Sequence, residues 1–493
     1  MANSFDQYNH FKQDVLFEVA KLAYEGKLNE QTPDEVAKKL ISHSEPKWRC
    51  CIYKEREIIR ERTNLAMGKD PEGNEPKNGQ FVYVLEAACD DCNIHRVRIT
   101  DNCRKCLFKP CQKACHFGAI YEGDSKMHIA YDKCKACSMC AKACPYGAIL
   151  LSDRPCHKAC PTGALKYIEG QIAEIDDPDC VNCGRCSASC PFGAISELST
   201  YTDVIKAITE GKKVIAMVAP AIVGQWGKAS LKQVYSALLK IGFTDIFEVA
   251  QGADLTTKHE ALEALEAKKE GRHITTSCCP AFVSLVQKFY PEVYKNHTSD
   301  VLSPMAITAR MAREKYPDAI NVFVGPCVAK KAERLLPKNI KNIDYVVTFE
   351  EITAMMKAKD VDPLKMAEDG VEVDNGSAAG RNFCNTGGVA ASLNKYLEEI
   401  GETERLTLKC ANGADECVKF VKQLAKNQQT EDVLEGMICE GGCMAGVDSQ
   451  ASNIFLVKNH ANQENIKAQA TKIETASQKY PDVICTFNKE TNE

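Results

Sequence analysis

The chain has 493 residues, of which 26% are charged and 27 are cysteine, and its formal net charge is −5. That length predicts two to four domains, each with its own core. The near-balanced charge gives no field that would favour nucleic acid or an anionic membrane as a partner. The longest apolar stretch, 214–223, is too short to span a bilayer, and the start MANSFDQYNHF lacks the pattern of a signal peptide. We therefore expect a soluble, cytoplasmic protein.

Residues 1–85 are expected to form a mostly helical N-terminal segment, because the apolar residues of DEVAKKLISH and CCIYKEREIIRERTNLAM recur at helical spacing. The following stretch, GKDPEGNEPKNGQ, is rich in Gly, Pro and Asn, which predicts a long loop. Cys50 and Cys51 belong to no motif, so we expect buried packing residues there rather than ligands.

Residues 86–200 contain one phrase four times: Cys, three residues, Cys, two residues, then Gly-Ala and Ile or Leu. The copies are CQKACHFGAI from Cys111, CAKACPYGAI from Cys140, CHKACPTGAL from Cys156 and CSASCPFGAI from Cys186. The phrase is typical of half of a bacterial-type ferredoxin, whose thiolates hold cubane iron–sulfur clusters. Four halves predict two ferredoxin-like α+β modules in tandem. The chain length and these tight spacings indicate metal ligation rather than a disulfide scaffold.

Sixteen cysteines in this region match the number that four 4Fe-4S cubanes require. In such modules three closely spaced thiolates bind one cubane and a fourth, before Pro, reaches the neighbouring cluster. Cross-ligation then predicts four ligand sets. They are Cys103, Cys106, Cys111 and Cys144; Cys134, Cys137, Cys140 and Cys115; Cys180, Cys183, Cys186 and Cys160; and Cys89, Cys92, Cys156 and Cys190.

The last set is inferred by counting, because Cys156 and Cys160 have no C-x2-C directly before them. The C-x2-C-x10-C-x2-C spacing from Cys89 to Cys106 also suits a tetrahedral zinc site. The sequence leaves both assignments open.

From 201 to 460, short β-branched runs alternate with amphipathic helical patterns, which predicts an α/β domain. The expected strands are KVIAMVAP, TDIFEV, NVFVGP and DYVVTF. Three cysteine motifs each follow a strand-like run: TTSCCPAF, GPCVAKKAE and CEGGCMAG. Together they could supply four thiolates for a further cubane, which Gly441 and Gly442 would let the backbone approach closely. Residues 461–493 are polar and are expected to form a peripheral C-terminal helix and tail.

These three motifs, in this order and behind ferredoxin repeats, resemble those of the FeFe-hydrogenases, whose active site is the H-cluster. The resemblance covers about 86–460 and favours the branch with TSCCP and GPC motifs. It implies a two-lobed α/β catalytic domain. It also implies an H-cluster, a 4Fe-4S cubane joined to a diiron subcluster with CO, cyanide and azadithiolate. The implied cubane ligands are Cys279, Cys327, Cys439 and Cys443, the last also bridging to the diiron unit.

The resemblance assigns roles to residues around that cofactor. Cys278 would stay free and exchange protons with the cofactor amine, and Lys330 would donate to an iron-bound cyanide. Ala219 and Pro220 would lie in the other loop that contacts cyanide, and Met437 would pack beside the diiron unit.

A proton route is implied by GADLTTKHEALEALE, which resembles the family helix that follows an ADLT motif and places Glu260 and Glu263 one turn apart. Glu260 would accept protons from Cys278 through water, Thr298 or Ser299 would relay them, and Glu263 would lie near the surface.

Other interpretations of the carboxylates remain open. Without the ADLT context, Glu260, Glu263 and Glu266 would be interpreted as a solvated helix face. Glu333 is either part of a second proton route or a salt-bridge partner.

Several positions depart from the best-studied members of the family. Gly325 replaces Met, Met305 replaces Gln, Ala221 replaces Ser, and CMAGVDS replaces a glycine-rich tail. Groups around the ligands tune a metal site, so these changes bear on rate and catalytic bias. Four further cysteines match no motif and are expected to be packing residues: Cys384, Cys410, Cys417 and Cys485.

The resemblance implies reversible dihydrogen oxidation and proton reduction, with a soluble ferredoxin as electron partner and maturases that insert the diiron unit. No G-x-G-x-x-G behind a strand and no flavin motif is present, which argues against direct nicotinamide reduction. The alternative is a non-catalytic or slow dihydrogen or redox sensor that holds the same cluster. The presence of Cys278 and Lys330 favours catalysis.

Overall fold

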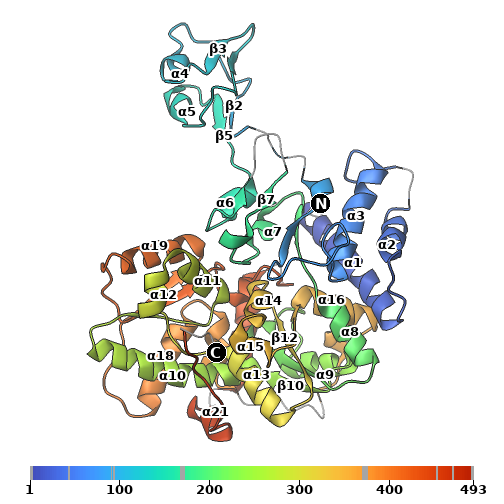
Figure 1. Cartoon of the computed structure of the whole chain (residues 1–493), viewed down its shortest axis with the longest axis vertical. Helices are drawn as coiled ribbons and strands as arrows, with labels where there is room; N and C mark the ends of the chain where they lie inside the picture. Colours follow the sequence, from blue (N-terminus) through green and yellow to red (C-terminus); the bar gives the residue numbers. More distant parts are fainter. Residues whose placement is uncertain are drawn as a thin grey trace.

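The computed structural model describes residues 4–42, 45–89, 92, 95–166, 172–368, 376–450, 453–468 and 471–489. Figure 1 shows a small module at one end of the molecule, then a second module beside three N-terminal helices, and a large α/β region at the other end. Of the described helices, none combines the length and the apolar composition that crossing a membrane requires.

The N-terminal segment forms α1 (Ser4–Tyr24), α2 (Thr32–Leu40) and α3 (Ile52–Ala66). Val15 and Val19 of α1 are buried in one core together with side chains of the α/β region, so this segment packs as part of the main body. Cys50 is exposed, and the expected packing role is therefore wrong for this residue. It lies in an irregular stretch before α3.

The second ferredoxin-like module is discontinuous along the chain. Its first antiparallel pair joins β1 (Val82–Val84) to β8 (Ile195–Glu197), and its second joins β6 (Leu165–Lys166) to β7 (Glu174–Ile175). The helices α6 (Pro155–Ala159) and α7 (Arg185–Ser189) complete it. Because β1 belongs to this module, the module begins before the boundary expected at residue 85.

The first module is inserted between these parts. It pairs β2 (Val97–Ile99) with β5 (Ile149–Leu151) and contains the hairpin of β3 (Ile120–Glu122) and β4 (Met127–Ile129). Its helices are α4 (Pro110–Lys113) and α5 (Met139–Ala143). The two ends of the insertion meet, because the Ser152 N–H donates to the Arg96 carbonyl oxygen at 2.8 Å. The two modules are thus nested, each with its own core.

The Gly-Ala step of the fourfold phrase has a structural reason. Its four glycines adopt φ between 57° and 73°: Gly118, Gly147, Gly163 and Gly193. The alanines that follow them are at most 2% exposed: Ala119, Ala148, Ala164 and Ala194. Glycine allows the left-handed turn, and the small alanine then fills the core of the module.

The four strands expected in the α/β region form one parallel sheet in the order β10–β9–β12–β13. Their bounds are β9 (Val214–Val218), β10 (Asp245–Glu248), β12 (Ile320–Gly325) and β13 (Tyr345–Thr348). All five residues of the central strand β9 are buried, which accounts for its continuous apolar run.

A second parallel sheet, in the order β11–β15–β14, has no counterpart among the expected strands. Its strands are β11 (Ile274–Thr275), β14 (Leu408–Asn412) and β15 (Val433–Met437). Helices pack against both sheets. They are α8 (Tyr201–Thr209), α9 (Leu231–Ile241), α10 (Val249–Lys269), α11 (Pro280–Phe289), α12 (Pro291–His297), α13 (Pro304–Lys315), α14 (Ala329–Arg334), α15 (Pro337–Ile340), α16 (Phe349–Ala358), α17 (Ala378–Arg381), α18 (Gly388–Glu399) and α19 (Ala414–Leu424).

The C-terminal segment contains α20 (Ile454–Lys467), which crosses the boundary expected at 460, and α21 (Glu474–Lys479). The chain then returns to the α/β region, where Thr486 pairs with Val301 and the Leu302 N–H donates to the Cys485 carbonyl oxygen at 2.7 Å. This part of the segment is therefore packed rather than peripheral. Residues 490–493 of the expected tail lie outside the described residues.

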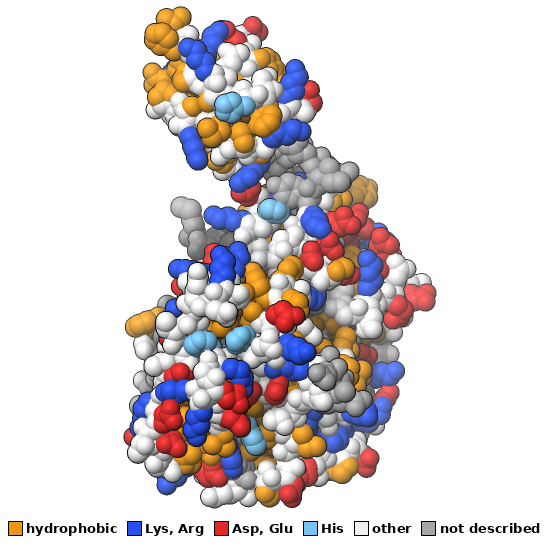
Figure 2. All heavy atoms as spheres, turned by 60° about the vertical axis from the view of Figure 1, so that its left-hand side comes forward, with side chains coloured by type: hydrophobic (Ala, Val, Ile, Leu, Met, Phe, Trp, Pro, Cys, Tyr) orange, Lys and Arg blue, Asp and Glu red, His pale blue; other side chains and the backbone are white. Residues whose placement is uncertain are grey.

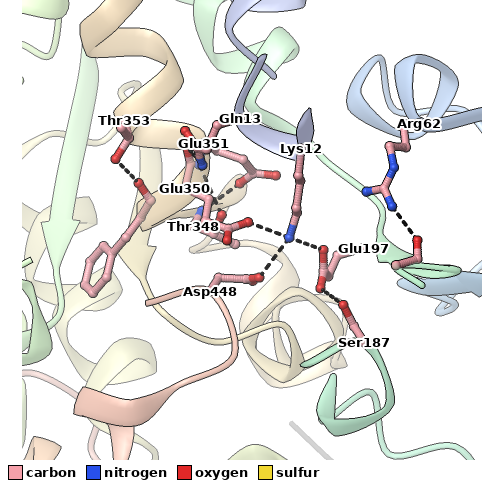
Figure 3. A network of polar contacts seen from close by, with 12 residues as sticks. Lys12, Gln13, Arg62, Ser187, Glu197, Thr348, Glu350, Glu351, Thr353 and Asp448 are labelled. Atoms are coloured by element: carbon pink, nitrogen blue, oxygen red, sulfur yellow. Dashed lines mark hydrogen bonds and ion pairs between the residues drawn. The ribbon is translucent and has the colours of Figure 1, made fainter. Parts of the chain in front are cut away.

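A buried ion cluster joins the N-terminal helix to the other parts (Figure 3). Lys12 of α1 lies 2.6 Å from Glu197 of β8, 2.5 Å from Glu350 of α16 and 3.5 Å from Asp448. Burial raises the pKa of Glu350 and of Asp448, whereas Lys12 lowers the pKa of Glu197 against the effect of burial. One ammonium group thus holds together three segments that are far apart in sequence.

Candidate active site

The cysteine motifs of the α/β region meet where parallel strands of the two sheets end. Ala219 follows β9, Cys327 follows β12, Cys279 follows β11 and Cys439 follows β15. Side chains from all four strand ends line one cavity with a volume of about 90 Å³. Parallel strands present their carboxyl ends at one edge of a sheet, which explains why motifs so far apart in sequence converge here.

The cavity collects the residues that the resemblance assigns to the cofactor. Its lining includes Ala219, Pro220, Cys278, Cys279, Cys327, Lys330, Met437, Cys439 and Cys443. Burial, followed by neighbouring thiols, raises the pKa of Cys327 and of Cys443 to about 12. Thiols with pKa values this high are protonated at neutral pH, so binding of a cluster here would release protons.

The chemistry of this donor set fits the H-cluster. Four thiols are placed for one cubane, a fifth is available beside them, and most of the remaining wall is apolar. Glycines make room for such a group, because a Cβ at Gly442 would lie 2.5 Å from the Cys384 carbonyl oxygen and one at Gly446 would lie 2.5 Å from the Pro326 carbonyl oxygen. At Gly442 the φ of 80° adds a second reason for glycine.

Lys330 is the buried cation of this cavity. Its Nζ lies 2.6 Å from Glu333 Oε2 and donates to Ser303 Oγ at 3.2 Å and to the Cys278 carbonyl oxygen at 3.4 Å. Glu333 and the cavity thiols raise the pKa of Lys330 against the effect of burial. Glu333 forms an ion pair with Lys330, which matches one of its two expected roles and keeps Lys330 charged and fixed in position.

Glu260 of α10 is fully buried behind the cysteine pair. Its Oε1 lies 2.9 Å from both the backbone nitrogen and the hydroxyl of Ser277, the residue before Cys278. Burial raises the pKa of Glu260 to about 7, and Glu263 adds to this rise. A carboxyl group with this pKa can both take and give a proton near neutral pH.

Ser299 lies between the two carboxylates of α10. Its hydroxyl donates to Glu263 Oε2 at 2.5 Å, and it lies close enough to Glu260 to lower the pKa of that group. The Thr298 hydroxyl instead accepts from the Thr275 hydroxyl at 3.2 Å. Of the two relay candidates, Ser299 therefore has the connecting geometry. Glu263 is half-buried, as a group near the exit would be.

Two residues at the site have no functional role assigned from the sequence. Ser277 contacts Glu260, but an isolated serine before a cysteine pair carries no signal of its own. Cys384 was expected to be a packing residue, and it is buried, but it also lines the cavity. Only the three-dimensional convergence of η5 (Asn382–Cys384) with the CEGGC loop brings it there.

Several of the cysteines that cross-ligation would group into one set lie close to one another in the structure. Burial and the thiols of Cys190, Cys92 and Cys89 raise the pKa of Cys156 to about 12. Three further cysteines have a pKa that is raised by burial and then by nearby thiols. Cys103 and Cys144 raise the pKa of Cys111, and Cys134 and Cys115 raise that of Cys140. Cys183, Cys180 and Cys160 raise the pKa of Cys186. One small cavity is lined by Cys115, Cys134, Cys137 and Cys140 together.

The zinc alternative has less support. Cys89 and Cys92 lie near Cys156 and raise its pKa, whereas Cys103 lies near Cys111 in the other module and raises the pKa of that residue. Cys89 and Cys92 are therefore near a different cysteine from Cys103. Among the described residues, no three His, Cys, Asp or Glu side chains are grouped closely enough for a single metal ion. A cubane, whose ligands bind different iron atoms, allows wider spacing between its thiols.

One cluster site adjoins the candidate active site. Cys183 lines the same cavity as Cys279, and it contributes to the raised pKa of Cys439. Arg185 of α7 donates to the carbonyl oxygen of Ile438 at 3.1 Å and so fixes the second module against the CEGGC loop. The arrangement gives a short path from the cavity to the cysteines of the second module.

Family models match three parts of the chain. Residues 212–447 match the iron only hydrogenase large subunit, C-terminal domain. Residues 151–201 match the LdpA Fe-S cluster-binding domain, and residues 127–150 match a 4Fe-4S binding domain.

Curated relatives extend this similarity along the chain. Iron hydrogenase 1 of Clostridium pasteurianum is 28% identical over 431 residues, which cover 74% of this chain and 73% of that protein. The NADP-reducing hydrogenase subunit HndD of Solidesulfovibrio fructosivorans is 26% identical over 427 residues, or 72% of this chain and 64% of that protein. A solved apo FeFe-hydrogenase from Chlamydomonas reinhardtii superposes with a TM-score of 0.45 and 19% identity over 55% of this chain and 89% of its own.

Proposed function

We propose that this chain, whose residues 212–447 match the iron only hydrogenase large subunit, C-terminal domain, catalyses the reversible conversion of dihydrogen to protons and electrons at an H-cluster. The observation that carries the proposal is the cavity itself. Four thiols suited to a cubane, the additional thiol of Cys278 and the ammonium group of Lys330 all line it. The bound H-cluster would supply the iron atoms at which dihydrogen is formed or split.

The ligands and their surroundings have separate tasks. Cys279, Cys327, Cys439 and Cys443 would hold the cubane, with Cys443 also reaching the diiron unit. Ala219, Pro220 and Met437 would shape the apolar wall that keeps bulk water out. Lys330, held by Glu333 and Ser303, would offer its ammonium group to an anionic ligand of the cofactor.

Protons would move through side chains of this chain. Cys278 would hold a proton next to the cofactor, and Glu260 would exchange it through one intervening water. Ser299 would pass it on by rotating its hydroxyl, because that hydroxyl already bonds to Glu263. Glu263, which is half-buried, would exchange it with solvent. This order leads from the cavity, through the buried Glu260, to the half-buried Glu263.

Electrons would travel through four 4Fe-4S clusters held by the sixteen module cysteines. The set that contains Cys183 adjoins the cavity, and the inserted first module lies at the far end of the molecule (Figure 1). A soluble ferredoxin would exchange electrons with that module. Maturases would insert the diiron unit, because no side chain of this chain supplies its CO or cyanide ligands.

A slow sensor of dihydrogen or redox state is the second candidate. The observation that favours it is the apolar character of two wall positions, Ala221 and Met305, where the best-studied enzymes carry Ser and Gln. Fewer hydrogen-bond donors around the cofactor would stabilise its charged states less and slow its turnover.

The test is dihydrogen uptake and evolution by anaerobically purified protein loaded with the diiron cofactor, beside a Cys278→Ala variant. The matched control is Cys417→Ala, which removes a buried thiol that does not line the cavity. Infrared bands of CO and cyanide report cofactor binding in all three proteins.

We expect fast turnover in the wild type and in Cys417→Ala, and loss of turnover in Cys278→Ala with the infrared bands retained. Infrared bands without turnover in the wild type would contradict catalysis and support the sensor. Absence of the bands after loading would contradict the cofactor assignment itself.

A further inference from the structure

The loop between Cys106 and Cys111 is longer than the other loops of its kind. Four residues, Leu107 to Pro110, separate these two cysteines, whereas the corresponding gap at Cys137 and Cys140 is two. The extra length forms a turn that carries two large apolar side chains into solvent. Leu107 is 87% exposed and Phe108 is 75% exposed. A ligand loop needs no such side chains to hold its cluster.

These side chains take no part in the packing of the module. The core of the first module is built from residues such as Val97, Ile120 and Met127, and neither Leu107 nor Phe108 contributes to it. Other large apolar residues of the same module are also exposed: Phe117, Tyr121, Met139 and Tyr146. An apolar surface of this kind usually marks a place where another molecule binds.

The first module is rich in basic side chains. Residues 95–153 contain ten Lys and Arg but five Asp and Glu, whereas acidic side chains are in slight excess over the whole chain. Figure 2 shows orange apolar and blue basic side chains interspersed over the module at the top of the view. A partner that fits this surface should carry acidic side chains around an apolar centre.

Basic residues flank the apolar turn itself. Lys113 Nζ lies 5.9 Å from the centroid of the Phe108 ring, and Arg104 is exposed two residues before Cys106. Lys105 and Lys109 both pair with Glu122, which leaves a surplus of positive charge at the turn. Within the described part of the chain, no carboxylate lies within ion-pair distance of Lys113.

The position of the turn favours a redox protein over other partners. Leu107 and Phe108 lie between two expected cluster ligands, and Cys137, an expected ligand of the neighbouring set, is exposed. A protein docked on this turn would bring its own redox centre close to the cluster, because Leu107 and Phe108 directly follow the expected ligand Cys106. A membrane bound at the same place would cover the cluster ligands on either side of the turn without exchanging electrons with them.

We propose that the surface formed by Leu107, Phe108, Arg104 and Lys113 is the docking site of a small acidic electron-carrier protein. The assignment of the carrier as an electron partner rests on the proposed function. The turn anchors the apolar centre of the carrier, and the lysine and arginine side chains orient its acidic rim. Electrons then enter or leave through the cubane held by Cys103, Cys106, Cys111 and Cys144.

The experiment measures binding and so does not depend on turnover. Anaerobically purified chain with its cubanes is titrated by calorimetry with an acidic 2[4Fe-4S] ferredoxin at low and at physiological salt. The variants are Leu107→Ser/Phe108→Ser and Lys113→Glu. The control is Phe455→Ser/Leu456→Ser, which removes two exposed apolar side chains of similar size from α20, outside the first module.

We expect binding of the wild type and the control that weakens as salt rises, and binding at least about tenfold weaker in both loop variants, since truncating an interface anchor or reversing a rim charge has effects of this size. Dihydrogen turnover with methyl viologen, a small mediator that needs no docking site, should be the same in all four proteins. Equal ferredoxin binding by wild type and loop variants would overturn the proposal. So would absence of ferredoxin binding by the wild type, or binding of the wild type to anionic lipid vesicles in place of ferredoxin.

A failure of the proposed function would look different. In that case methyl viologen would support no turnover by any of the proteins, while the calorimetry would still report whether ferredoxin binds at the turn.

Discussion

Glu260 combines full burial with a position between the cysteine pair and Ser299, so its substitution should affect proton transfer more than stability. Glu260→Gln keeps the size of the side chain and its acceptor for the Ser277 N–H, but removes the exchangeable proton. We expect turnover with methyl viologen to fall by about 100-fold or more. Glu266→Gln, an exposed substitution on the same helix, is the control and should have no effect.

The pH dependence tests the same assignment. Because burial raises the pKa of Glu260 to about 7, the wild-type rate should change slope near pH 7. The Glu260→Gln variant should lack that change of slope over the same range. An unaltered pH profile in the variant would mean that the proton travels by another route.

Asp254, also on α10, supports a prediction about stability. It accepts the Ser377 N–H at 2.8 Å, and burial, with help from Glu248 and Glu399, raises its pKa from 3.8 to about 8. The folded state therefore favours the protonated carboxyl group. The resulting stability is fully present below pH 4 and is lost as the pH rises toward 8.

Between pH 5.5 and 7.5 the free energy of unfolding should fall by roughly 2–3 kcal/mol through this group. Asp254→Asn should remove that fall. Urea unfolding followed by tryptophan fluorescence checks this in a Trp48→Phe background, because Trp226 is then the single tryptophan and reports on the α/β region. A fall of the same size in Asp254→Asn would assign the effect to other groups.

At the residue scale, the sequence predicted which residue types form the site better than it predicted which side chains contact one another. Distinct motifs pointed to the cavity cysteines and to Lys330, because thiols and amines are informative residue types at such spacings. The choice between Thr298 and Ser299 depended on which hydroxyl faces Glu263, and adjacent residues of a strand-like segment point in opposite directions. Spacing along the chain does not contain that information when the register is unknown.

At the scale of elements, the CEGGC loop depends on backbone that only glycine can adopt. Gly442→Ala would have to tolerate a φ of 80° and a Cβ 2.5 Å from the Cys384 carbonyl oxygen. Gly271→Ala is a matched control, because its φ is 70° but nothing lies within 4 Å of the added Cβ. We expect the control to cost about 1 kcal/mol of stability. Gly442→Ala should cost clearly more and should reduce the iron content measured after cluster loading.

The helix α1 is held by the ion cluster around Lys12. Lys12→Met would leave Glu197, Glu350 and Asp448 buried without their shared cation. Removing one partner from a buried ion pair typically costs about 3–5 kcal/mol. Lys27→Met breaks an exposed pair with Glu25 and should cost about 1 kcal/mol or less. Thermal melting of both variants, with limited proteolysis of the N-terminal segment, measures the difference; equal melting temperatures would contradict the role of the cluster.

The elements themselves were predictable to unequal degrees. The four strands of the sheet β10–β9–β12–β13 have apolar runs long enough to identify. The sheet β11–β15–β14 contains a two-residue strand and the mostly polar strand LKCAN, so no local pattern distinguishes it. The strands β11 and β14 form because each pairs with β15, and the paired residues are far apart in sequence.

At the scale of the whole molecule, the nesting of the two modules could not be predicted from the sequence. Four similar phrases suggest a linear series of two, but β1 pairs with β8 across the entire first module. This pairing explains why Cys89 and Cys92 precede the first module in sequence and yet lie beside Cys156 in space. The number of cysteines alone assigns Cys89 and Cys92 to the same partner, but it does not explain their distance from Cys156 along the chain.

Nesting also makes the first module removable. The insertion leaves and returns at adjacent points, where Arg96 forms an ion pair with Asp153 at 2.7 Å. No residue of 95–153 contributes to the core of the second module. Replacing 95–153 by a short Gly-Ser linker should therefore preserve the second module and the α/β region, and should lower the iron content by about eight atoms per chain, the content of two cubanes.

The deletion separates the two ends of the electron path. Dihydrogen turnover with methyl viologen should persist, because this small mediator can reduce the remaining clusters directly, whereas turnover with ferredoxin should be lost together with the surface around Phe108. A variant with the deletion that still exchanges electrons with ferredoxin at the wild-type rate would show that the carrier docks on the second module. A deletion variant that loses both activities while keeping its remaining iron would instead show that the first module holds the active site in its working form, and the two modules would then act as one unit with the α/β region.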